Sequence, residues 1–228
     1  MPDPQRRFEY RLRFPDGQQR VIPIVLDGAT LGCIEPPPAA RAWTALDCHR
    51  CPHCPLEPAA EPLCPLAARL DPLVDILGSV LSHQTLDVEV VAGERTVATH
   101  APAQAVASSI IGLIGATSGC PHTAFLKPLA WFHQPFAGEE ETVFRAVSAW
   151  FLKQHFRDLD GETPDWSLAG LRQRYDALHT VNVHLARRLR QASSCDATVN
   201  AIVRLDMFTK AVSGEIDEIL GFLRGRLG

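Results

Sequence analysis

The alternation of apolar and polar positions predicts two β-hairpins in the first hundred residues. Residues 7–26 alternate on both sides of Pro15-Asp16-Gly17, a combination typical of a turn between antiparallel strands. Pro23 has no amide hydrogen to donate, so its strand is expected at an edge of the sheet. Residues 86–100 repeat the alternation around Ala92-Gly93. Because each hairpin has one apolar face to cover, we expect the two to pair into one small sheet.

Helical spacing of apolar positions dominates the rest of the chain. Residues 63–81 have this spacing, and Asp71-Pro72 is expected to divide the segment into two pieces. Residues 103–119 are mostly apolar, with small side chains at intervals that allow another element to approach closely. Three glutamates follow Gly138, which indicates the start of a helix because acidic side chains complement the helix dipole.

The last part of the chain predicts two long amphipathic helices, 165–191 and 196–225, packed antiparallel across a short connection. The predicted fold class is therefore α+β: a small antiparallel sheet of two hairpins packed on a bundle of four to five helices. We expect one domain over residues 1–228, with the hairpins and a cysteine- and proline-rich loop in residues 1–100 and helices in residues 101–228.

Composition narrows the classes of function. A chain of 228 residues is long enough to bury a core without disulfides. Its net charge of -4 and pI of about 6.1 argue against a surface for nucleic acid or an anionic membrane. The nearest approach to a basic patch is Arg187, Arg188 and Arg190, which we interpret as a solvated helix face.

The first residues lack the apolar centre of a signal peptide, and no later run reaches the roughly 18 apolar residues of a membrane span. This predicts a cytoplasmic location without membrane contact. The seven cysteines are then expected to be metal ligands, redox groups or core thiols, because the cytosol keeps thiols reduced.

Four cysteines stand out because proline follows each of them, a clear excess in a chain with 18 prolines among 228 residues. Three lie in the stretch "CHRCPHCPLEPAAEPLCP", residues 48–65, and the fourth lies in "SGCPH". Four thiolates complete a tetrahedral zinc site or hold an iron–sulfur cluster. We predict a metal site with zinc as the favoured ion and an iron–sulfur cluster as the alternative. Its ligands would be Cys51, Cys54, Cys64 and Cys120.

The spacing of the cysteines in this loop also allows a second set of metal ligands. Cys48, Cys51 and Cys54 form C-x2-C-x2-C, a run that in ferredoxins supplies three ligands of a four-iron cluster. Cys64 or Cys120 would then be the fourth ligand. The sequence "CPHC" also fits one half of a zinc knuckle, although proline follows it where glycine is usual.

Histidines add further alternatives. His53 or His122 could replace one thiolate. Cys120 could instead be a reactive thiol with His122, Lys127 and His133 nearby in sequence. The favoured interpretation is that Cys120 is a ligand, His122 donates a hydrogen bond to its sulfur, and His133 packs in the core.

The motifs "CPHCPL", "CPLA" and "SGCPHTAF" together resemble an uncharacterised family of bacterial proteins known as a domain of unknown function. We expect the resemblance to cover the chain from the first hairpin to about His155. It implies a soluble bacterial protein and assigns no activity.

The sequence thus favours a cytosolic metal-binding protein with a structural or sensory site. An iron–sulfur or thiol redox protein is the first alternative. A metal-free interaction module is the second, with its long helices forming a homodimer or binding a protein partner. No phosphate-binding loop or hydrolase motif is present, so no catalytic residue is assigned. Cys33 and Cys195 are interpreted as ordinary buried thiols.

Overall fold

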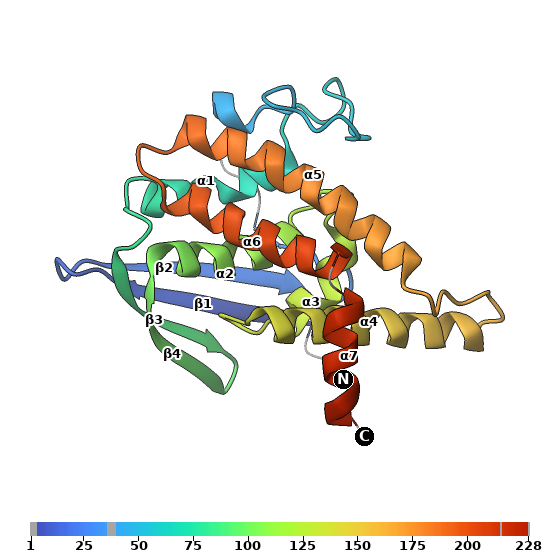
Figure 1. Ribbon diagram of the computed structural model, residues 1–228. Coiled ribbons are helices and arrows are strands. Elements are labelled where there is room, and N and C mark those ends of the chain that lie inside the picture. Colours follow the sequence, from blue (N-terminus) through green and yellow to red (C-terminus); the bar gives the residue numbers. More distant parts are fainter. Residues whose placement is uncertain (1–3, 36–39, 215, 228) are drawn as a thin grey trace.

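The two predicted hairpins form one four-stranded antiparallel sheet in the order β2-β1-β3-β4 (Figure 1). The computed structural model describes residues 4–35, 40–214 and 216–227. The strands are β1 (Gln5–Arg13), β2 (Gln19–Asp27), β3 (Thr85–Ala92) and β4 (Arg95–Pro102). β1 pairs with β3, which confirms that the hairpins share a sheet. Each turn contains a glycine with positive φ, Gly17 at +83° and Gly93 at +62°.

One face of the sheet is buried and the other faces solvent. Phe8, Tyr10 and Leu12 alternate with exposed residues along β1 and are at most 1% exposed. β2 is an edge strand, as Pro23 predicted, and Pro23 lies opposite Glu9 of β1. The alternation of apolar and polar residues therefore predicts both the positions of the strands and the face of the sheet that the helices cover.

The described residues contain seven α-helices, more than the four to five expected. The helices are α1 (Pro65–Leu77), α2 (Ala103–Thr117), α3 (Lys127–Trp131), α4 (Glu139–Leu159), α5 (Ala169–Ala192), α6 (Ala197–Gly214) and α7 (Ile216–Leu227). Two short 3₁₀ helices, η1 (Ala42–Thr44) and η2 (Ala124–Leu126), precede α1 and α3. No helix in the described ranges combines the length and apolar character needed to cross a membrane.

Two expected helix boundaries are wrong. α1 runs without interruption through Pro72, which is exposed, so its ring lies on the solvent side and costs only one helix hydrogen bond. The segment expected as one helix, 196–225, forms two helices: α6 ends at Gly214 and α7 begins at Ile216. Met207 of α6 is 61% exposed, so it lies outside the contact between α5 and α6.

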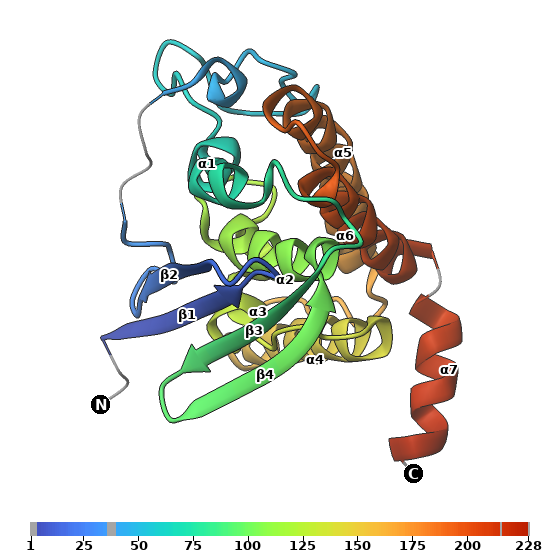
Figure 2. The same ribbon diagram turned by 90° about the vertical axis from the view of Figure 1, so that its left-hand side faces the viewer.

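α2 occupies the centre of the molecule. It lies between the sheet and the antiparallel pair α5–α6, and the proline-rich loop lies beyond α1 and α5 (Figure 2). Eleven of its 15 residues are buried, as the apolar sequence predicted. A continuous cluster of buried apolar side chains extends from Phe8 in β1 to Ile216 in α7. The layer of helices above the sheet therefore determines where the cysteine segments lie. A large cavity, described below, also lies within this layer.

Candidate metal centre

The cysteine-rich loop is closed at its base by backbone pairing. The amide of Leu46 donates to the carbonyl of Pro62, and the amide of Cys64 donates to the carbonyl of Thr44, both at 2.8 Å. Next to this pairing, Trp43 donates its indole N–H to Asp71 of α1 at 3.1 Å. Cys64 is then the N-cap residue of α1, so the loop base and the helix together place its side chain.

A buried arginine of α5 holds the same loop base. Arg188 donates through Nη1 to the carbonyls of Trp43 and Ala45, at 2.9 and 2.6 Å, and through Nη2 to the carbonyl of Leu46 at 2.9 Å. Its side chain is buried, with 3% of the residue exposed. The interpretation of this arginine as part of a solvated face is therefore wrong, although Arg187 and Arg190 are exposed as expected.

Hydrogen bonds also shape the segment that carries the first cysteines. The amide of Cys54 donates to the carbonyl of Cys51 at 3.0 Å, which closes a tight turn over Pro52-His53. Arg50 donates to the carbonyls of Cys54 and Leu56. These bonds bring the thiols of Cys51 and Cys54 to one side of the loop, next to α5.

The remaining cysteine comes from the turn that follows α2. Gly119 has a φ of +96°, a conformation that favours glycine, and a Cβ added there would lie 3.7 Å from the Cβ of Pro65. The amide of Cys120 donates to the hydroxyl of Ser118 at 3.2 Å. The positive φ at Gly119 thus lets the chain pass beside Pro65, which places Cys120 next to Cys64.

Thiols from these three segments line one small cavity. Its volume is about 30 Å³, close to the share of one water molecule in the liquid. Two guanidinium groups and several aliphatic side chains complete the wall. The polar lining residues are Cys51, Cys54, Cys64, Cys120, His122, Arg50 and Arg188. Within the described residues, no group of three or more His, Cys, Asp or Glu side chains is already arranged so that it could hold a metal ion.

Burial favours the protonated form of two of these thiols, Cys51 and Cys120. It raises the pKa of Cys51 to about 12, and negative charge on Cys64, Cys120 and Cys54 would raise it further, whereas Arg188 lowers it. Burial also raises the pKa of Cys120, against the effect of the amides of His122 and Thr123. A reactive thiol requires a lowered pKa, so the alternative of Cys120 as a nucleophile receives no support.

Two histidines stack beside the thiols. The rings of His53 and His122 have centroids 3.9 Å apart and planes inclined by 32°. His122 donates from Nε2 to the carbonyl of His53 at 2.9 Å, and His53 donates from Nε2 to the carbonyl of Ala177 at 3.1 Å. The ring of His122 therefore bonds to a carbonyl rather than to the sulfur of Cys120 as expected. Nδ1 of His53 is buried and has no partner within the described part of the chain.

The other candidate residues have separate partners. Cys48 donates to Gln191 at 3.3 Å, and Cys33 donates to Glu35 at 3.2 Å. Lys127 donates to the carbonyl of Thr30 at 2.8 Å. The structure thus gathers the four Cys-Pro thiols and His122 around one cavity, and Cys48, Cys33 and Lys127 do not line it. Cys195, which does not line it either, is partly buried beside α6.

His133 belongs to a different network, between the sheet and α2. Its Nε2 lies 2.6 Å from the hydroxyl of Tyr10, which lies 2.7 Å from the hydroxyl of Ser109. Burial lowers the pKa of His133 to about 3, and the positive charges of Arg145 and Arg6 act in the same direction. The interpretation of His133 as a core histidine with a hydrogen-bond partner agrees with these contacts.

The lowered pKa of His133 predicts a loss of stability in mild acid. The histidine of the unfolded chain takes up a proton near pH 6.5, whereas the folded protein binds it only near pH 3. The unfolded state therefore binds more protons between these values, and the free energy of unfolding falls as pH is lowered, by up to about 2 kcal/mol at pH 5. Urea unfolding at pH 7 and 5 measures this. His133→Gln should remove most of the difference, and the exposed His155→Gln should leave it; equal pH dependence in both variants would contradict the assignment.

The fold and the cavity together define an α+β protein in which a proline-rich loop, α1 and the turn after α2 bring four cysteines to one place. The chain belongs to a family described as a domain of unknown function, DUF6901, whose model matches residues 8–227. The match extends beyond His155, where the resemblance was expected to end, and includes the C-terminal helices. No curated protein and no solved structure gives a significant match.

Proposed function

We propose that the protein binds one metal ion through Cys51, Cys54, Cys64 and Cys120, with zinc as the ion and a structural or sensory role. The observation that carries the proposal is the cavity of about 30 Å³ on which these four thiols meet, although Cys120 comes from a distant part of the sequence. Because no three of these side chains are already arranged around one point in the described residues, the sulfurs must move to reach the distance of about 2.3 Å from a central zinc ion.

The chemistry of the lining favours zinc. Thiolates are soft ligands and select zinc or iron–sulfur clusters over magnesium or calcium, and the cavity lining includes no carboxylate. A four-iron cluster brings eight iron and sulfide atoms into the site, so it needs more space than a single zinc ion.

The surrounding charges also suit a four-thiolate complex. Zinc bound by four thiolates carries a net charge of about -2, which is costly to bury without compensation. Arg50 and Arg188 line the same cavity. Arg188 has no carboxylate within ion-pair distance among the described residues, so its charge is free to stabilise the anionic complex.

The proposal is tested by metal analysis of the purified full-length chain. We expect about one equivalent of zinc and a colourless sample. Replacing Cys51, Cys54, Cys64 or Cys120 by alanine should each weaken binding by more than about a hundredfold, because even residues bonded to a ligand contribute about ten- to a hundredfold. Cys48→Ala is the matched control, since Cys48 lies in the same loop but outside the cavity, and it should retain zinc.

Other outcomes identify the alternatives. A brown sample that contains iron and sulfide indicates a cluster instead of zinc. Retention of metal by Cys120→Ala with loss in Cys48→Ala indicates that the local C-x2-C-x2-C run supplies the ligands. Cobalt titration gives a second measure, because thiolate-bound cobalt is coloured even in a variant of reduced stability. If neither zinc nor cobalt binds the wild-type protein, the proposal is wrong.

A further inference from the structure

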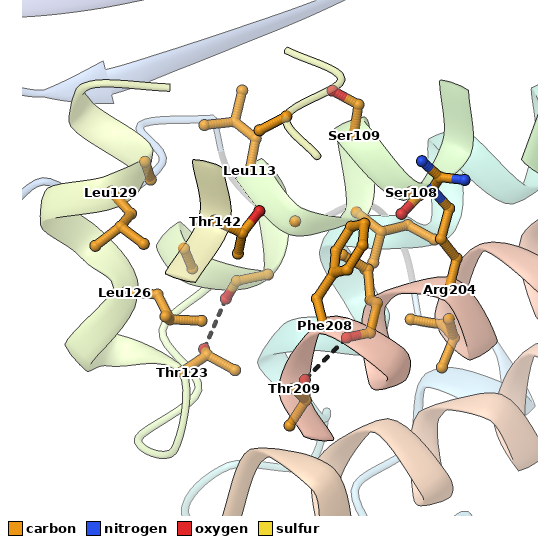
Figure 3. Close-up of a pocket in the computed structure, with 18 of the residues that line it drawn as sticks. Ser108, Ser109, Leu113, Thr123, Leu126, Leu129, Thr142, Arg204, Phe208 and Thr209 are labelled. Atoms are coloured by element: carbon orange, nitrogen blue, oxygen red, sulfur yellow. Dashed lines mark hydrogen bonds between the residues drawn. The ribbon is translucent and has the colours of Figure 1, made fainter. Parts of the chain in front are cut away.

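A larger cavity lies next to the cysteine cavity. Its volume is about 290 Å³, near the lower end of the range for small-molecule sites, and its wall is mostly apolar. Residues of α2, α3, α4, α5 and α6 form this wall (Figure 3). Leu126 and Leu129 lie on one side of it, and Arg204 and Phe208 lie beside Ser108 on the other. Leu66, Val181 and Leu185 line both cavities, so these side chains stand between the two sites.

Small residues of α2 leave this space unfilled. The sequence predicted that they would allow another element to approach, and at Gly112 this occurs: an added Cβ would lie 3.7 Å from Leu205 of α6. Elsewhere along the helix, Ala105, Ser108 and Ala116 face the cavity rather than a packed side chain. The space is open to solvent on one side, so it is a pocket that a small molecule can enter from outside.

Two hydroxyl groups in the wall have no protein partner. Tyr175 is 3% exposed and Ser108 is 4% exposed, and neither hydroxyl makes a hydrogen bond with the described part of the chain. Other polar side chains in the wall are paired: Thr123 donates to the carbonyl of Gly115, and Asn182 donates to Thr209. Neither hydroxyl oxygen is fully enclosed, so both are available to bond to water or to a polar group on a molecule in the cavity.

A positive charge lies in the same wall as these hydroxyls. Arg145 of α4 lines the cavity and is close enough to Tyr175 for its charge to lower the pKa of the phenol. Its Nη2 donates to the carbonyls of Leu129 and Phe132, at 2.7 and 2.8 Å. Within the described residues it has no carboxylate within ion-pair distance, and burial lowers its pKa. A partly buried cation beside a phenolic donor is a site for an anionic oxygen.

We propose that this cavity binds an amphipathic monocarboxylate, a small organic acid with one carboxylate and an apolar body. The carboxylate accepts hydrogen bonds from the Tyr175 hydroxyl and from the Arg145 guanidinium. The apolar body lies against Leu126, Leu178 and Leu205, and the hydroxyl of Ser108 bonds to a further polar atom or to water. This inference is independent of the metal proposal, because it uses none of the thiols.

Calorimetric titration of the full-length protein with hexanoate, octanoate and decanoate tests this proposal, with 1-octanol as the uncharged comparison. Octanoate should bind at least about tenfold more tightly than 1-octanol, because a hydrogen bond from a charged group to a buried partner contributes about that factor. Affinity should rise about fourfold with each methylene until the cavity is filled. Methyl NMR shifts of Leu126, Leu178 and Leu205 should locate the ligand.

Variants separate the carboxylate site from general apolar binding. Tyr175→Phe keeps the shape of the wall and should weaken octanoate about tenfold while leaving 1-octanol unchanged. Arg145→Met should abolish the preference for octanoate. Arg187→Met, an exposed arginine of α5, is the matched control and should bind like the wild type. If Arg145→Met fails to fold, Tyr175→Phe and the comparison with 1-octanol still test whether the cavity binds a carboxylate. Equal affinity for octanoate and 1-octanol, or no binding of any alkanoate at millimolar concentration, overturns the proposal.

Discussion

Removing the proposed zinc ion with a strong chelator should lower the melting temperature of the protein by about 8 to 16 °C. The two ends of the loop, Ala45 and Leu63, pair with each other at its base, and the tip of the loop holds few backbone hydrogen bonds. A structural metal ion contributes its binding free energy to folding because an assembled site rarely exists in the unfolded chain. A loss of about 4 kcal/mol shifts the melting temperature of a chain of this length by roughly 8 to 16 °C.

Differential scanning calorimetry before and after chelation measures this shift. Limited proteolysis by trypsin adds a local readout, because Arg50 lies inside the loop and should be cleaved faster in the metal-free protein. Cys48→Ala should show the full chelator effect, whereas Cys120→Ala should melt near the chelated wild type and respond little to chelator. A melting temperature that chelation leaves unchanged, in protein shown to contain zinc beforehand, means that the metal has no structural role.

The elements of the fold were predictable because each depends on a local pattern. Alternation around Gly17 and Gly93 predicts both hairpins, and the apolar composition of residues 103–119 predicts a buried helix. The change of direction between α6 and α7 was missed, since the apolar spacing continues from one helix to the other (Figure 2). Features that form only where several distant segments meet were harder to predict from the sequence. The large cavity could not be predicted, because small residues at helical spacing indicate close packing equally well.

For the candidate metal centre too, one part could be predicted from a local sequence pattern and another part was missed. A following proline singled out Cys51, Cys54, Cys64 and Cys120 in the sequence, and the structure places all four on one cavity. Whether they bind a metal stays a prediction. The contribution of Arg188 was missed, although a signal was present: Leu178, Val181, Leu185 and Arg188 follow one another at intervals of three and four residues. This spacing puts Arg188 on the apolar face of α5, where an arginine needs several hydrogen-bond acceptors.

Arg188→Met should therefore destabilise the protein by about 4 kcal/mol, far more than an ordinary surface substitution. The substitution keeps an unbranched side chain on α5 but leaves the carbonyls of Trp43, Ala45 and Leu46 without the guanidinium that binds them. Each hydrogen bond to a charged group contributes about 1.5 to 3 kcal/mol, and the apolar contacts of methionine restore part of the loss. Urea unfolding of the wild type and the variant measures the difference.

Arg187→Met provides the matched control, because the neighbouring side chain is exposed on the same helix and should change stability by less than about 0.5 kcal/mol. Arg188→Met should also weaken zinc binding by about ten- to a hundredfold, since the guanidinium lines the thiol cavity and compensates the charge of the thiolates. Lysine at this position retains the charge but lacks the planar fork that reaches three carbonyls, so Arg188→Lys should restore zinc affinity more than stability. Equal stability of Arg187→Met and Arg188→Met would show that the loop base is held by its backbone pairing alone.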